Sequence, residues 1–103
     1  MADAPLKVAE GTALSAQQKK DLLNRLARIE GQLRGVQKLV ALAAAPSDID
    51  AVAQQMAAAR KALDRSFVQL LTGAIQTQSG NAANLEEAKE RAAHLAAMLD
   101  KFA

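Results

Sequence analysis

The side chains of this chain best suited to binding another molecule are its basic residues, which concentrate in one segment. Residues 19–38 contain six basic and two acidic residues, whereas the remainder of the 103-residue chain is net acidic and the overall charge is only +2. Neutralisation of phosphates by Lys and Arg dominates affinity for nucleic acids. The segment therefore indicates either a nucleic-acid contact or a solvated basic face of a helical bundle. Its basic residues are Lys19, Lys20, Arg25, Arg28, Arg34 and Lys38.

A second basic group, Arg60, Lys61 and Arg65, follows later in the chain. On a helical projection, Lys61 and Arg65 point away from the apolar seam of their helix. The basic side chains of residues 19–38 lie on two different sides of the helix predicted for that segment. Neither helix alone therefore carries a continuous basic stripe. A phosphate-binding face would need several copies of these residues to meet on one oligomer.

Residues suited to catalysis or metal binding are scarce. The absence of cysteine excludes a disulfide scaffold, a thiolate zinc site and a Cys nucleophile. His94 is the only histidine, and as an isolated imidazole it is expected to be a surface or packing residue rather than a ligand. Glu86, Glu87 and Glu90 are explained by the start of a helix, where acidic residues are favoured. We expect no enzyme activity, no cofactor and no metal centre.

Gly31 and Gly35 form a Gly-x-x-x-Gly pattern inside a predicted helix. Each costs about 1 kcal/mol relative to Ala there, so a compensating interaction is expected. The structural explanation is close approach of another backbone on the outer face of the helix. The functional alternative is access for a phosphate or a partner helix.

Apolar spacing predicts three helices and no strand. The first helix spans roughly residues 15–44 and is stopped by Pro46, because proline disfavours the helical conformation of the residue before it. Its seam follows a four-three spacing typical of helices that pack on other helices. The seam residues are Leu22, Leu26, Ile29, Leu33, Val36 and Val40.

The second and third helices carry their own capping signals. Ser47 and Asp50 form a capping-box-like start for a second helix of about 30 residues, which ends near Gly80. Asn84, followed by Glu87 at the third helical position, caps the third helix.

The chain is expected to consist of a flexible arm, residues 1–15, and a single helical oligomerisation domain, residues 16–103, whose basic residues are candidate contacts for DNA. Half of the residues are hydrophobic but only 2% are aromatic, so an isolated chain would have a thin core. Two long helices in one chain leave half of each seam exposed, which predicts an all-α homodimer built as an antiparallel four-helix bundle, and then a dimer of dimers. We see neither a membrane span nor a secretory signal, and expect a cytoplasmic protein.

Two sequence blocks, LNRLARIEGQLRGV at residues 23–36 and QMAAARKALDR at residues 55–65, resemble the CsoR/RcnR/FrmR family of bacterial repressors. The resemblance covers about residues 18–100. It implies a three-helix chain that forms a four-helix-bundle dimer and a flat tetramer, and that binds double-stranded operator DNA without a helix-turn-helix. It places Arg25, Arg28 and Arg65 where family members carry DNA-contacting basic residues, with Lys20, Arg34 and Lys61 as electrostatic support.

The chain departs from this family at the inducer site. The positions that usually hold a Cys, a His and a further Cys or His correspond to Ile49, Ala74 and Gln78. None can bind copper or nickel, or react as a thiolate. The sequence therefore predicts a sequence-specific DNA-binding repressor that does not respond to metal through the usual site. The alternative is a helical oligomerisation or interaction module that has lost DNA binding.

Overall fold

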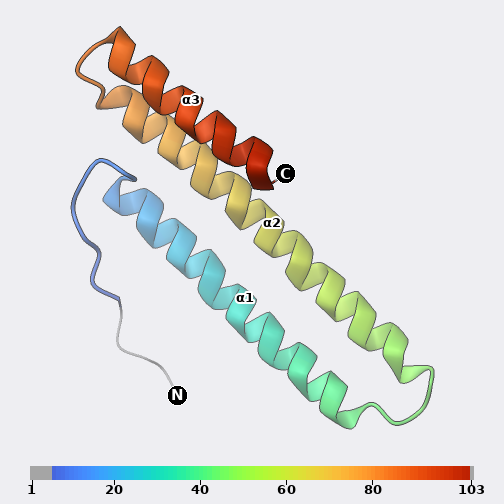
Figure 1. The fold of residues 1–103 in the computed structure, drawn as a ribbon. Helices are drawn as coiled ribbons and strands as arrows, with labels where there is room; N and C mark the ends of the chain where they lie inside the picture. Colours follow the sequence, from blue (N-terminus) through green and yellow to red (C-terminus); the bar gives the residue numbers. More distant parts are fainter. Residues whose placement is uncertain (1–5, 103) are drawn as a thin grey trace. The chain divides into compact units, whose positions relative to one another are not determined.

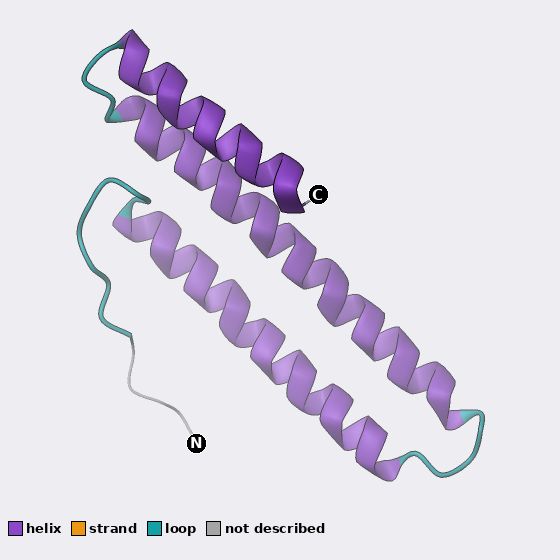
Figure 2. Ribbon diagram, in the orientation of Figure 1, coloured by secondary structure: helices purple, strands orange, loops and turns teal. Residues whose placement is uncertain are grey.

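The computed structural model describes residues 6–102 and contains three α-helices (Figure 1). Helix α1 spans Ala16–Leu42, α2 spans Asp48–Gly80 and α3 spans Leu85–Phe102. No strand occurs in this part of the chain, so the predicted all-α class is confirmed (Figure 2). The first five residues of the predicted arm lie outside the described residues, and residues 6–15 contain no helix.

The chain divides into two compact units. The unit Leu22–Gln69, called the hairpin unit below, contains most of α1 and the first part of α2. The unit formed by Met1–Asp21 and Leu70–Ala103, called the terminal unit, contains the start of α1, the end of α2 and all of α3. Across residues 6–102, no helix is long and apolar enough to cross a membrane.

In the hairpin unit, α1 and α2 run antiparallel and enclose a narrow core (Figure 1). Ile29 and Val36 of α1 and Val52 and Ala59 of α2 are buried. These side chains are aliphatic and none is aromatic, which agrees with the thin core expected from the composition.

Only part of the predicted seam is used within one chain. Leu33 and Val40 of α1 are 48% and 54% exposed, and Met56 and Leu63 of α2 are 50% and 52% exposed. Apolar side chains of this size at regular helical spacing are usually covered by another helix. The hairpin unit thus has one buried apolar stripe and a second one that faces outward.

The turn before α2 is fixed by Asp48, not by the predicted capping residues Ser47 and Asp50. The Asp48 carboxylate accepts hydrogen bonds from the backbone N–H groups of Ala44 and Ala45, at 3.0 and 2.9 Å. These bonds hold the pKa of Asp48 below its usual value, because they favour the ionised carboxylate. The capping prediction was wrong because the Asp48 carboxylate reaches back to the turn that follows α1 and leaves the first turn of α2 to backbone hydrogen bonds.

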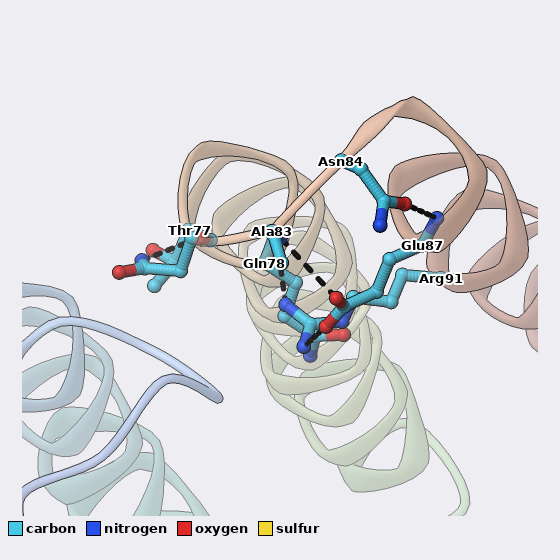
Figure 3. A network of polar contacts seen from close by, with 7 residues as sticks. Thr77, Gln78, Ala83, Asn84, Glu87 and Arg91 are labelled. Atoms are coloured by element: carbon cyan, nitrogen blue, oxygen red, sulfur yellow. Dashed lines mark hydrogen bonds and ion pairs between the residues drawn. The ribbon is translucent and has the colours of Figure 1, made fainter.

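In the terminal unit, α3 folds back along the end of α2 (Figure 1). Leu71 and Ala74 of α2 and Leu95 of α3 are its buried apolar residues. The predicted Asn84 cap is confirmed in Figure 3, where Asn84 Oδ1 accepts the Glu87 N–H at 2.9 Å. Glu87 Oε2 accepts the N–H of Ala83, the residue before the cap, at 3.2 Å.

The turn between α2 and α3 is also secured by Arg91. Its guanidinium donates to the Gln78 backbone oxygen at 3.0 Å and forms an ion pair with Glu87 (Figure 3). Glu87 therefore takes part both in the cap of α3 and in an i,i+4 ion pair within that helix.

Candidate nucleic-acid interface

Four residues of α1 form one longitudinal row in the hairpin unit. Arg25, Arg28, Ile29 and Gln32 are separated by three, one and three positions, a spacing that puts them on the same face of a helix. Together with Ala62 and Arg65 of α2 they line a pocket of about 290 Å³. The structure therefore brings Arg25, Arg28 and Arg65 together, although they come from two helices.

The charged residues that line this pocket are all positive. It contains three arginines and no acidic residue. Within residues 6–102, none of the three guanidiniums forms an ion pair, and the only ion pair found there joins Glu87 to Arg91. Arg28 and Arg65 are exposed and Arg25 is half-buried, so all three remain able to bind an external anion.

Small side chains on α2 leave room for the pocket between the three arginines. Ala62 contributes only a methyl group to the lining, and Ala59, one turn earlier, is buried. Ser66 is also buried, and its hydroxyl donates to the Ala62 backbone oxygen at 3.0 Å. That bond satisfies the hydroxyl within its own helix, which removes it as a competitor for a ligand.

Gln32 is a lining residue that the sequence did not reveal as a candidate. Its Oε1 atom is buried and has no hydrogen-bond partner among the described residues. Since that oxygen has no accessible surface, the amide NH₂ group is the polar part of Gln32 able to reach a ligand. The i+4 spacing from Arg28 was the available signal, but a glutamine at such a position is ordinarily a solvated residue.

The supporting basic residues lie elsewhere. Arg34 and Lys61 are exposed in the hairpin unit and do not line the pocket. Lys20 is an exposed residue of the terminal unit. Their predicted role depends on an extended charged surface and not on this pocket.

The two glycines of α1 do not meet another backbone within the described chain. A Cβ atom added at Gly31 or Gly35 would find nothing within 4 Å. The close approach expected from the sequence is therefore absent among residues 6–102.

The three positions aligned with the inducer site hold no metal-binding side chains. Ile49 is 57% exposed in the hairpin unit. In the terminal unit, Ala74 is buried and Gln78 is half-buried. No group of three or more His, Cys, Asp or Glu side chains in the described part of the chain could hold a metal ion, and His94 is exposed.

Comparison with known proteins gives one match. No curated protein and no solved structure matches the chain significantly. The family model for the metal-sensitive transcriptional repressor matches residues 18–101, which include nearly all of α1 and α3, all of α2 and every residue that lines the pocket. The chain therefore belongs to the metal-sensitive transcriptional repressor family.

Proposed function

We propose that this protein is a DNA-binding transcriptional repressor that holds operator phosphates through Arg25, Arg28 and Arg65. The observation that carries the proposal is that three guanidiniums, none of which forms an ion pair within residues 6–102, meet around one pocket with no carboxylate in its lining. Each guanidinium offers several N–H donors in a planar fork that suits phosphate oxygens. Family membership supports the regulatory role.

Assembly of several chains would increase the number of arginine pockets available to DNA. The outward-facing apolar stripe of the hairpin unit, which includes Leu33 and Met56, fits the seam of a second hairpin. A homodimer, and from it a homotetramer, would present several arginine pockets to one duplex. Repression then follows from occlusion of a cytoplasmic promoter by the assembled protein.

The metal response suggested by the family name does not fit these residues. A hydrocarbon at Ile49, a methyl group at Ala74 and a neutral amide at Gln78 provide no thiolate or imidazole for a soft or borderline metal. We therefore propose that release from DNA does not depend on metal binding at these positions.

DNA binding by the full chain tests the proposal. The probe is the duplex upstream of the protein's own gene, compared with an unrelated duplex of equal length at several salt concentrations. We expect preferential binding to the first duplex, a steep loss of affinity with salt, and weaker binding by Arg28→Ala and Arg65→Ala. Arg60→Ala, which removes the same charge from an exposed position on α2 outside the pocket, is the matched control.

Equal, weak binding to both duplexes would contradict the proposal and favour the alternative of a helical interaction module. So would arginine-pocket variants that bind as tightly as Arg60→Ala.

A further inference from the structure

We propose that the pocket of Arg25, Arg28, Gln32 and Arg65 is also a binding site for a small tetrahedral dianion, inorganic phosphate or a phosphomonoester, which competes with DNA. The competitive part rests on the proposed function, whereas binding of the anion to the free protein does not. This would give the repressor an anionic effector in place of the metal that its inducer positions cannot bind.

The charge of the pocket favours a dianion. Three positive side chains line it, and no described residue pairs with them. A DNA phosphodiester carries one negative charge, so a single phosphodiester leaves most of this positive charge uncompensated. A phosphomonoester carries close to two charges above its second pKa of about 6, and it offers three oxygens to the guanidiniums.

The volume of the pocket suits a small anion. Its volume of about 290 Å³ lies just below the range for small-molecule sites, which begins at about 300 Å³. A phosphate with a short carbon skeleton fits this volume. Ile29, only 5% exposed, and Ala62 form apolar parts of the lining, and apolar walls strengthen the attraction between charges.

Gln32 gives the pocket a neutral hydrogen-bond donor in addition to the three cations. Because its oxygen is buried and unpartnered, the amide NH₂ group is the part that can donate to an anion. Replacing this amide with a carboxylate of the same shape would set a negative charge beside the ligand. Gln32→Glu is therefore a sharp test that removes no packing volume.

The chain offers a closely matched control in Gln69. It lies in the same unit, is half-buried like Gln32, and also has a buried Oε1 without a partner, but it does not line the pocket. Gln69→Glu therefore causes the same change in net charge and a comparable burial of a carboxylate. Circular dichroism of both variants checks that each retains the helical content of the natural protein.

Isothermal titration calorimetry of the full chain at pH 8 measures anion binding directly. The probes are inorganic phosphate and glycerol 3-phosphate, with sodium chloride keeping the ionic strength constant. We expect saturable binding by the natural protein and by Gln69→Glu, and at least about tenfold weaker binding by Gln32→Glu and by Arg28→Ala. Tighter binding of one probe identifies free phosphate or a phosphomonoester as the better ligand.

Heats that match those of added chloride, or equal loss in Gln32→Glu and Gln69→Glu, would overturn the anion site. If Gln32→Glu alone fails to fold, the comparison of phosphate binding by Arg28→Ala and by Arg60→Ala decides whether the anion site exists.

DNA competition at constant ionic strength separates this inference from the proposed function. Displacement of upstream DNA by phosphate, reduced in Arg28→Ala, supports both. DNA binding that requires the arginines, without any phosphate binding, overturns the anion site and retains the repressor. Phosphate binding without DNA binding retains the anion site and removes the proposed function, and phosphate that binds without displacing DNA removes the competitive role.

Discussion

Arg28 on α1 and Arg65 on α2 line the same pocket, and no carboxylate lines it with them. Two cations held near each other without a counter-charge repel, so a bound anion relieves a cost that the free protein carries. The pairing also means that the two side chains are able to act on one phosphate, which distinguishes them from scattered surface charges.

A double-mutant cycle follows from this arrangement. If Arg28 and Arg65 hold one phosphate, Arg28→Ala and Arg65→Ala will not be additive in DNA affinity, and the coupling should be on the order of 0.5–3 kcal/mol. Fluorescence anisotropy with labelled upstream DNA measures the four affinities. The pair Arg28→Ala and Arg60→Ala serves as the reference cycle, and coupling of equal size in both cycles would show that the two pocket arginines do not share a phosphate.

The half-exposed seam residue Leu33 should be needed for assembly more than for helix formation. Leu33→Asp places a charge on the outward apolar stripe, and burying it against a second chain would cost several kcal/mol. We expect loss of oligomers in analytical ultracentrifugation, with helical circular dichroism retained at high protein concentration. Gln37→Asp, at an exposed polar position of the same helix, should leave the assembly unchanged. Intact oligomers in Leu33→Asp would show that this stripe is not the contact between copies.

Asp48 should make stability sensitive to acid. Its pKa is lowered in the folded protein by the backbone N–H groups of Ala44 and Ala45, so its stabilising effect is present above the usual value of 3.8 and is lost as the pH falls through the lower folded value. Asp48→Asn removes the charge and retains an acceptor oxygen. We expect the natural protein to be more stable than Asp48→Asn in urea at pH 6, and the difference to shrink below pH 3.8. A difference that stays constant across this range would contradict the role of the carboxylate charge.

Gly31 should be a weak point of the single chain. Nothing lies within 4 Å of a Cβ added there, so Gly31→Ala should raise the free energy of unfolding by about 0.5–1 kcal/mol. Urea denaturation in a Leu33→Asp background measures this without the contribution of assembly. In the otherwise natural protein, the same substitution should weaken oligomers or DNA binding if a second molecule approaches the glycine closely. A decrease in stability of the single chain would indicate a conformational need for Gly31 that its helical position does not suggest.

Substitution of Asn84 tests the N-terminal cap of α3, which the sequence predicted correctly. Asn84→Ala removes the acceptor for the Glu87 N–H and should cost about 1 kcal/mol of stability, mainly through fraying of α3. Thermal unfolding followed by circular dichroism measures the loss. Asn84→Asp restores an acceptor and should recover most of it, and a similar loss in both variants would show that the side-chain bond contributes little.

Features that depend on local sequence could be predicted, and features that depend on two helices meeting could not. The helix spacing and the Asn84 cap are local, because each follows from residues within one or two turns. The seam was predicted as a single stripe, but burial divides it: Ile29 and Val36 face the core, whereas Leu33 and Val40 face outward. A helical projection predicts the side of the helix on which a residue lies. It does not predict which other helix, if any, packs against that side.

The pocket shows the same limit. Arg65 was expected to point away from its own seam, and it is exposed, yet it shares a lining with Arg25 and Arg28. Their meeting depends on the register between α1 and α2, which no spacing within either helix determines. The inclusion of Gln32 required that register as well, together with the burial of its oxygen.

Gln18 links the beginning of α1 to a distant part of the chain through one oxygen atom. Its Oε1 accepts the Ser15 N–H at 2.7 Å and the Thr77 hydroxyl at 2.5 Å, while the Ser15 hydroxyl accepts the Gln18 N–H at 3.0 Å. Fraying of the first turn of α1 and its detachment from α2 should therefore occur as one opening event. Native-state amide exchange would report a common opening free energy for the two segments, and Gln18→Leu would make both exchange faster.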